Sequence, residues 1–342
     1  MQLKSELTHV PAVTVIVPTL AAGATLVECI ESLEHQTFQD HEVIVVDNSG
    51  AGLAAKALAG RRVRIIENER NVGFGCAINQ AARESSAPWL AVLNDDARAR
   101  PEWLQAMMEA VEPRPDVGMV APRILLQGGN ALDSAGMLLC ADGTAKQRGH
   151  GQPADAFPRR QEMLLASGCA ALYRREMFDE VSGFDERFFL YCEDADFGLR
   201  ARWKAWECLY APDAVVEHRY SQSAGKASTL KAFYVERNRL YLAVKLLPWP
   251  MLLAMPFVSL ARYFWHFVYA HKGRGAAARF KADEGAAAGF ATVARAWMAL
   301  VVGIRPLLAD RRAIRRTRRL TPKQFTRIVR RYAISPRQVA SQ

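Results

Sequence analysis

Short runs of β-branched and other apolar residues alternate with segments of helical spacing through the first quarter of the chain. The runs occupy residues 13–17, 43–46, 63–66 and 89–93, and the segments between them place apolar residues three or four positions apart. Continuous apolar strands separated by helices are typical of a parallel sheet with helices on both faces. We therefore expect an α/β fold built on a mostly parallel central sheet.

Polar residues follow each of these four predicted strands. They are Pro18-Thr19, Asp47-Asn48-Ser49, Glu67-Asn68 and Asn94-Asp95-Asp96. Ligands bind at the carboxyl ends of the strands in sheets of this kind, so these residues are candidates for a binding site. Asp95 and Asp96 repel each other, and their burial is costly unless a cation or hydrogen bonds compensate. The alternative is a polar turn in which Asp96 caps the helix that begins after Pro101.

A second group of ionisable residues lies further along the chain. An aromatic run, residues 188–191, directly precedes Glu193, Asp194 and Asp196, and a short apolar run leads to His218. One or two carboxylates hold a divalent cation on a diphosphate, often with a histidine when the metal is manganese. A further carboxylate can then act as general base on an acceptor hydroxyl. Each of these residues is more often structural when it occurs alone, so the hypothesis rests on their occurrence together.

The composition fits a globular protein of one or two domains. The 342 residues are 50% apolar and 23% charged, unlike a disordered chain. The six cysteines are scattered without a CxxC pair, which is typical of reduced thiols in the cytoplasm, and the first ten residues lack the apolar segment of a secretory signal. The net charge is +10, and from Arg305 onward 12 Lys and Arg residues accompany a single acid, so the excess positive charge lies in the tail.

Two apolar segments follow residue 240. Residues 246–261 carry no charge but are interrupted by three prolines, and residues 286–304 are interrupted by Arg295. A helix that spans a membrane needs about 20 apolar residues, a length that the first segment does not reach. Its basic and aromatic flanks, which include Arg262 and the aromatic residues after it, favour helices that lie in a membrane interface. Core helices are the alternative.

A short amphipathic helix is expected near the C-terminus. Thr321 and Pro322 form a typical helix start, and an apolar stripe follows at helical spacing: Phe325, Ile328, Val329 and Tyr332. The remaining faces of this helix are basic. We expect the tail to bind an anionic membrane surface, at about 1 kcal/mol per basic residue near the surface. Docking of the stripe on the rest of the protein is the alternative.

Six motifs occur in order between residues 12 and 225. They are "VTVIVPTL", "VIVVDNS", "ENERNVGFGCAINQA", "VLNDDA", "SGCAALYRREMFDEVSGFDERFFLYCEDADFGLRAR" and "APDAVVEHRYSQS". Together they resemble family 2 of the glycosyltransferases, inverting enzymes of the GT-A fold that use nucleotide-sugar donors, and especially its bacterial rhamnosyltransferase-like branch. The resemblance implies a GT-A catalytic domain over residues 1–225 and a helical, membrane-associating C-terminal region over residues 226–342.

The resemblance also implies which residues bind the nucleotide-sugar. Pro18 and Thr19 are expected against the ribose and base, and Asp47 is expected to bind the base in a pocket shaped by Asn48 and Ser49. The same set includes Asn71 and Gly73, in a turn close to the nucleotide, Asn79 on the helix behind that turn, and Asn94 and Asp95.

The catalytic and metal-binding residues are implied in the same way. The stretch Asn94-Asp95-Asp96 stands at the position of the DxD motif of the family, with an amide in place of the first acid. Asp96 and His218 are the implied ligands of a Mg²⁺ or Mn²⁺ ion. Glu193 and Asp194 match the catalytic acidic pair of the family, in which the second member, Asp194, is usually the general base.

The expected function is the inverting transfer of a sugar to a hydroxyl of a lipid-linked or polysaccharide acceptor in cell-surface glycan synthesis. The branch implies rhamnose from dTDP-rhamnose, and another sugar, such as galactofuranose from a UDP donor, is the alternative. We expect a peripheral or monotopic protein on the cytoplasmic face of the inner (plasma) membrane, without a nucleic-acid partner and in an oligomeric state that the sequence does not indicate. The competing hypothesis is not an enzyme but a membrane-tethered nucleic-acid-binding protein that uses the Arg-rich tail.

Overall fold

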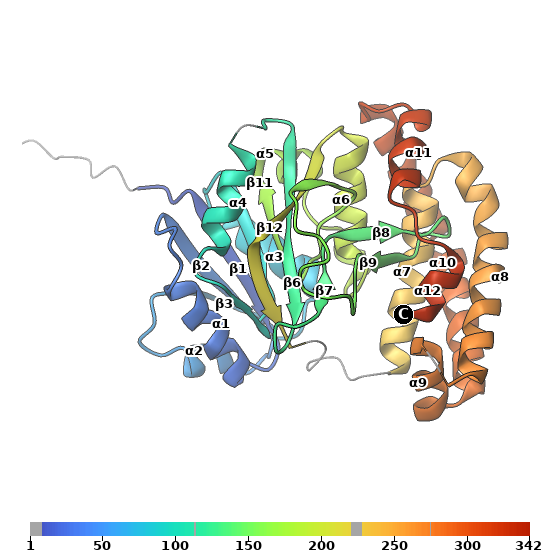
Figure 1. Cartoon of the computed structure of the whole chain (residues 1–342), viewed down its shortest axis with the longest axis horizontal. Helices are drawn as coiled ribbons and strands as arrows, with labels where there is room; N and C mark the ends of the chain where they lie inside the picture. The colour runs from blue at the N-terminus through green and yellow to red at the C-terminus, as the bar shows by residue number, and fades with distance from the viewer. Residues whose placement is uncertain (1–8, 113, 220–227, 274) are drawn as a thin grey trace, which may run out of the picture.

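The chain divides into an α/β part, which occupies its N-terminal two thirds, and a helical part that follows (Figure 1). The computed structural model describes residues 9–112, 114–219, 228–273 and 275–342. The expected domain boundary at residue 225 lies outside the described residues, so the division into two domains stays a prediction.

A ten-stranded sheet forms the centre of the α/β part. Its first half contains the four expected strands: β1 (Val13–Thr19), β2 (His41–Asp47), β3 (Arg64–Glu67) and β4 (Trp89–Leu93). β1 pairs in parallel with both β2 and β4, and β2 pairs in parallel with β3. The α/β class and the parallel arrangement of these strands are therefore confirmed.

The second half of the sheet mixes strand directions. It contains β5 (Ala97–Ala99), β6 (Val117–Leu126), β7 (Leu132–Ser134), β10 (Gln161–Met163), β11 (Ala170–Arg174) and β12 (Glu207–His218). β11 runs antiparallel to β4 and β6, whereas β12 pairs in parallel with β6. β8 (Met137–Leu139) and β9 (Ala145–Gln147) form a separate hairpin.

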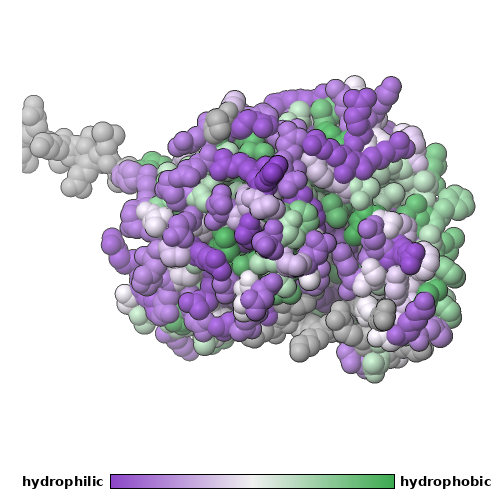
Figure 2. All heavy atoms as spheres, viewed as in Figure 1, coloured by the Kyte–Doolittle hydropathy of each residue, from purple (hydrophilic) through white to green (hydrophobic). Residues whose placement is uncertain are grey.

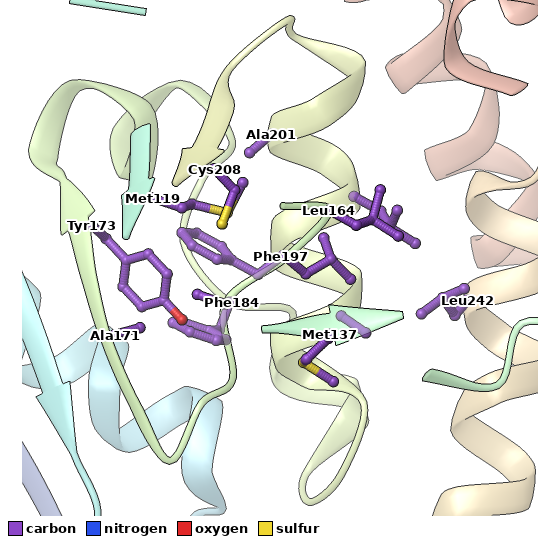
Figure 3. Packing of buried hydrophobic residues seen from close by; sticks show 14 of the residues in the cluster. Met119, Met137, Leu164, Ala171, Tyr173, Phe184, Phe197, Ala201, Cys208 and Leu242 are labelled. Atoms are coloured by element: carbon purple, nitrogen blue, oxygen red, sulfur yellow. The ribbon is translucent and has the colours of Figure 1, made fainter. Parts of the chain in front are cut away.

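The side chains of the strands alternate between two cores, one on each face of the sheet, as the two-residue period of a strand requires. α1 (Ala24–Glu34) and α4 (Trp103–Val111) cover the core that contains Val15 of β1. α3 (Phe74–Arg83) and α6 (Glu193–Trp203) cover the core that contains Ile16. Figure 3 shows part of this second core, in which Tyr173, Phe184 and Phe197 pack against one another. Two shorter helices complete the α/β part, α2 (Leu53–Ala57) and α5 (Arg175–Glu180).

The helical part comprises α7 (Thr229–Leu246), α8 (Trp249–His271), α9 (Gly275–Glu284), α10 (Ala286–Thr317), α11 (Pro322–Arg331) and α12 (Pro336–Ser341). By length and composition alone, α8 and α10 are long and apolar enough to cross a membrane. The expectation of a proline-broken segment is largely wrong. Pro248 and Pro250 stand at the start of α8, where backbone N–H groups have no partner in the helix, and only Pro256 lies inside it.

The apolar stripe of α11 packs on the α/β part. Phe325 is fully buried and stacks on Trp203 of α6, with ring centroids 3.9 Å apart and an interplanar angle of 4°. Val329 and Tyr332 are buried as well. Docking of the stripe on the rest of the protein is therefore confirmed, and the expectation that this stripe contacts a membrane is wrong. An amphipathic pattern predicts that the apolar face of a helix contacts another apolar surface, but it does not distinguish a protein core from a lipid surface.

Replacement of Phe325 with alanine should destabilise the folded protein by about 3–5 kcal/mol, because it removes a fully buried ring and leaves a cavity against Trp203. The midpoint of urea unfolding, followed by circular dichroism, measures the change. Lys323→Ala, on the exposed face of the same helix, is the matched control and should change the free energy of unfolding by no more than about 0.5 kcal/mol. Equal midpoints for the two variants would contradict a stabilising role for the stack.

Candidate active site

The predicted ligand-binding residues meet at one edge of the sheet, where β1, β2 and β4 end. Thr19 ends β1, Asp47 ends β2 and Asn94 directly follows β4. The hydroxyl of Thr19 donates a hydrogen bond to Oδ2 of Asp95, 76 positions away in the chain, at 2.6 Å. The backbone N–H of Asn48 donates to the carbonyl of Thr19 at 2.8 Å. The parallel directions of the strands thus bring together three of the motifs.

Asp47 fixes the loop that follows β2. Its Oδ1 accepts from the backbone N–H of Ser49 and its Oδ2 from that of Ala54, both at 2.8 Å. Burial acts to raise the pKa of Asp47, but the hydrogen bonds from Ser49 and Ala54 outweigh it and lower the pKa below its ordinary value. The ionised carboxylate therefore holds the loop at Ser49 in place, and Pro18 of β1, which is half-buried, pairs with Val46 just before this loop.

The turn before α3 requires glycine at position 73. Gly73 has a φ of +88°, and a Cβ atom there would lie 2.5 Å from the carbonyl oxygen of Phe189. The side chain of Asn71 accepts from the N–H of Gly73 at 2.9 Å and closes the turn. The N–H of Phe74 donates to the same Phe189 carbonyl at 3.0 Å, so the turn is bonded to the segment that precedes α6.

Asn79 lies on α3 behind this turn, as expected, but its amide is occupied. Nδ2 donates to the carbonyl of Phe184 and Oδ1 accepts from the N–H of the same residue, each at 2.9 Å. In the structure Asn79 therefore joins α3 to the loop after α5. Contact between Asn79 and a nucleotide stays a prediction.

The side chains of Asp95 and Asp96 contact different partners. Burial raises the pKa of Asp95 to about 6, the hydrogen bond from Thr19 opposes the rise, and the charge of Asp96 adds to it. Oδ1 of Asp96 lies 3.2 Å from Nε2 of His218. The alternative role for Asp96, the cap of the helix after Pro101, is wrong, because Glu102 occupies the N-cap position of α4.

His218 is held on its other side by Asp133 of β7, a residue that sequence reasoning missed. Nδ1 of His218 lies 2.8 Å from Oδ2 of Asp133, and Oδ1 of Asp133 lies 3.0 Å from Nδ1 of His150. An ionised carboxylate only accepts hydrogen bonds, so this contact places a hydrogen on Nδ1 of His218 and presents Nε2 toward Asp96. A carboxylate behind a histidine is the usual support for a metal ligand.

The arrangement of Asp96 and His218 fits a divalent cation. Mg²⁺ holds octahedral ligands at about 2.0–2.1 Å, which places neighbouring ligand atoms about 3 Å apart, close to the 3.2 Å that separates Oδ1 from Nε2. Within the described residues no group of three or more His, Cys, Asp or Glu side chains is placed to hold a metal. Two protein ligands leave the remaining positions to phosphate oxygens and water, as is common beside a diphosphate.

Glu193 and Asp194 form the second half of the site, at the N-terminus of α6. Oδ2 of Asp194 accepts from the N–H of Gly168 at 2.9 Å and Oδ1 from the N–H of Ala195 at 2.7 Å. Burial raises the pKa of Asp194, and these hydrogen bonds oppose the rise. Burial and the nearby Asp194 raise the pKa of Glu193 to about 8, and among the described residues its Oε2 has no hydrogen-bond partner. Of the two carboxyl groups, that of Asp194 ionises more readily, because two backbone donors stabilise its carboxylate.

Asn238 of α7 is a further residue that sequence reasoning missed. It is completely buried, and its Nδ2 lies 2.9, 2.8 and 2.7 Å from the carbonyl oxygens of Phe188, Leu190 and Tyr191. This segment leads directly into Glu193. No sequence signal marks Asn238 or Asp133, because neither belongs to a motif at a strand end.

The fold corresponds to that of glycosyltransferases of the GT-A type. The sequence profile of glycosyl transferase family 2 matches residues 14–182. The N-acetylglucosaminyl-diphospho-decaprenol L-rhamnosyltransferase of Mycobacterium tuberculosis is 30% identical over 247 residues, which cover 64% of this chain and 80% of that protein. The chain therefore belongs to glycosyl transferase family 2.

Two other proteins extend the comparison. The O-antigen biosynthesis protein RfbC of Myxococcus xanthus is 30% identical over 232 residues, which cover 62% of this chain and 18% of that protein. The mannosyltransferase PcManGT of Pyrobaculum calidifontis, solved in complex with GDP-Man and Mn²⁺, is 16% identical with a TM-score of 0.51. The match covers 98% of this chain and 86% of that chain, and at this identity it concerns the fold alone.

Replacement of Asp194 with asparagine should lower turnover by about 10²–10⁴-fold while donor binding stays nearly unchanged, because the amide cannot accept a proton from the acceptor. Initial rates at saturating donor, with donor affinity from calorimetry, separate the two effects. Glu193→Gln is the matched comparison, since burial and the nearby Asp194 raise the pKa of Glu193 to about 8 and make it the weaker acid of the pair. A larger loss for Glu193→Gln, or near wild-type turnover of Asp194→Asn, would overturn the assignment.

Replacement of Asp133 with asparagine should weaken Mn²⁺ binding by about 10–100-fold, because it removes the carboxylate that orients His218. Calorimetric titration of Mn²⁺ into the protein with saturating nucleoside diphosphate measures this without reference to turnover. Asp213→Asn, at an exposed position of the same strand as His218, should leave the affinity unchanged. Equal affinities for the two variants would show that Asp133 does not support a metal ligand.

Proposed function

We propose that this glycosyltransferase transfers a sugar from a nucleotide-sugar to an acceptor hydroxyl with inversion at the anomeric carbon. The observation that carries the proposal is the link between the two halves of the site. The N–H of Gly168 donates to Asp194, and the carbonyl of the next residue, Cys169, accepts from the N–H of Asn94 at 2.9 Å. A buried carboxylate is thereby held beside the turn that carries Asp96.

The proposed roles of the residues follow from this placement. A bound Mg²⁺ or Mn²⁺ would neutralise the diphosphate leaving group, with Asp96 and His218 as its protein ligands. The edge formed by Thr19, Asp47 and Asn48 would bind the nucleotide. Asp194 would accept the proton of the attacking hydroxyl, opposite the leaving group, and such an in-line displacement inverts the configuration.

The proposed donor is dTDP-rhamnose, and the proposed acceptor is a lipid-linked or polysaccharide glycan. The mycobacterial relative is named for rhamnosyl transfer onto N-acetylglucosamine linked to decaprenol through a diphosphate. This name supports an amino sugar linked to a polyprenyl diphosphate as the first acceptor to test. Galactofuranose from a UDP donor is the alternative. Membership in an enzyme family disfavours the hypothesis of a nucleic-acid-binding protein.

The proposed location is the cytoplasmic face of the inner membrane, as a peripheral or monotopic protein. The apolar helices α8 and α10 support it, since only 22% and 17% of their most apolar windows are buried. A lipid-linked acceptor presents its sugar at the same surface.

Incubation of the protein with dTDP-rhamnose, UDP-galactofuranose or GDP-mannose and a detergent-dispersed N-acetylglucosaminyl-diphospho-polyprenol tests the proposal. We expect transfer from dTDP-rhamnose with Mg²⁺ or Mn²⁺ present, its loss in EDTA, and an inverted anomeric configuration by NMR. Transfer from the UDP donor alone would select the alternative sugar. A product with retained configuration, full activity in EDTA, or binding of none of these donors would contradict the proposed reaction.

A further inference from the structure

An apolar surface covers the side of the helical part that faces away from the sheet. On α8 it consists of Trp249, Leu253, Phe257, Leu260, Phe264 and Phe267, which are 49–73% exposed. Their spacing of three or four residues places them on one face of the helix. On α10 it continues with Phe290, Met298, Val301 and Val302, which are 61–86% exposed. Figure 2 shows apolar residues gathered along the outer edge of the molecule over α8.

This accumulation is specific to α8 and α10. Among the described residues, every other exposed large apolar side chain belongs to Val10, Leu20 or Leu230. Contiguous exposed apolar patches of this kind are uncommon on soluble monomers and mark a surface that meets a partner or a membrane.

The two helices lie side by side and run in opposite directions. Nε1 of Trp297 in α10 donates to the hydroxyl of Tyr263 in α8 at 3.3 Å. The guanidinium groups of Arg311 and Arg315, near the end of α10, lie 4.6 and 5.2 Å from the ring centre of Trp249, at the start of α8. The exposed faces are therefore neighbours, and that of α8 extends over about 27 Å from Trp249 to Phe267 at 1.5 Å per residue.

The opposite face of α8 is bound to the protein by buried ion pairs. Nε of Arg262 lies 2.7 Å from Oδ2 of Asp142, in the turn between β8 and β9, and its second guanidinium nitrogen lies 2.8 Å from Oε2 of Glu236 in α7. Ser259 of α8 accepts from Arg239 of α7 at 3.2 Å. A helix that crossed a bilayer would be separated from these partners and would carry Arg262 unpaired into hydrocarbon. Lipid can therefore contact only the outer side of α8.

The charges around the surface match an anionic bilayer. Arg262 is the only Lys, Arg, Asp or Glu between Trp249 and His271, and it is buried, so the exposed face of α8 carries none of these charges. Beyond its apolar stretch α10 exposes Arg305, Arg312 and Arg316. Apolar side chains with arginines at their border are typical of helices that lie among anionic headgroups.

We propose that the outer faces of α8 and α10 form a membrane-docking surface, on which both helices lie in the plane of one anionic leaflet and neither spans the bilayer. The proposal rests on the membrane location given above but is independent of the sugar that is transferred. The proposal assigns membrane contact to α8 and α10 and not to the apolar stripe of α11, which is buried.

Flotation of the full-length protein with vesicles of equal parts phosphatidylcholine and phosphatidylglycerol tests the surface. The double variant Phe257→Glu, Phe264→Glu should bind about tenfold or more weakly, because it removes two apolar anchors. Arg312→Ala with Arg316→Ala should lose affinity for these vesicles but not for pure phosphatidylcholine. Val10→Glu, at an exposed apolar position of the α/β part, is the matched control and should bind like the unaltered protein. Unchanged binding of the Phe257, Phe264 double variant would overturn the proposal.

Two further measurements distinguish in-plane docking from a membrane-spanning arrangement and from dimer formation. Protease added outside the vesicles should leave no protected fragment of α8 or α10, and a protected fragment would overturn the in-plane arrangement. Light scattering in solution tests whether a second copy of the chain covers the surface instead of a membrane. A protein that forms a dimer, does not bind vesicles and becomes a monomer in the Phe257, Phe264 double variant would overturn the proposal. Transfer to a water-soluble acceptor analogue should be equal in all variants, so failure of docking is separable from failure of the proposed reaction.

Discussion

A single buried amide, that of Asn238, holds the segment on which both halves of the site depend. Phe189, Tyr191 and Cys192 have φ angles of +61°, +67° and +65°, a conformation that costs about 1–2 kcal/mol for each residue with a side chain. Asn238 offsets this strain, because its two hydrogens are shared among three carbonyl oxygens of the segment, one of which, that of Phe188, also accepts from Arg237. The strained turn in turn fixes the point at which α6 begins, and with it Glu193 and Asp194.

The same segment connects all parts of the molecule. The carbonyl of Phe189 accepts from Phe74, so the glycine turn before α3 and the acidic pair share one support. Nζ of Lys245 in α7 lies 2.7 Å from Asp196 of α6 and completes the attachment of α7. The helical part therefore supports the geometry of the acidic pair Glu193 and Asp194. Since α10 packs on α7, the lipid-facing surface that we propose is one layer of helix away from Asn238.

The features that sequence reasoning found are those that local patterns determine. Apolar runs identified the first four strands, and because parallel strands end at one edge, Thr19, Asp47 and Asp95 were expected to meet there. Asp133, His150 and Asn238 were missed because their roles come from contacts with residues at least 17 positions away, and nothing in their own neighbourhood marks them. The stripe of α11 was assigned to the wrong apolar partner for a related reason, since its contact with Trp203 depends on how the whole chain folds.

Two pairs of adjacent acids show how the site divides its charges. Asp95 and Asp96 follow β4 with their side chains directed to different partners, Thr19 on one side and His218 on the other. The imidazole of His218 lies between two carboxylates, with Nε2 facing Asp96 and Nδ1 facing Asp133, which also contacts His150. Glu193 and Asp194 have no cationic partner in the contacts described, and there burial and the charge of Asp194 raise the pKa of Glu193 to about 8. The first pair is therefore suited to hold positive charge and the second to exchange a proton, which is the division of labour that metal-assisted transfer to a hydroxyl requires.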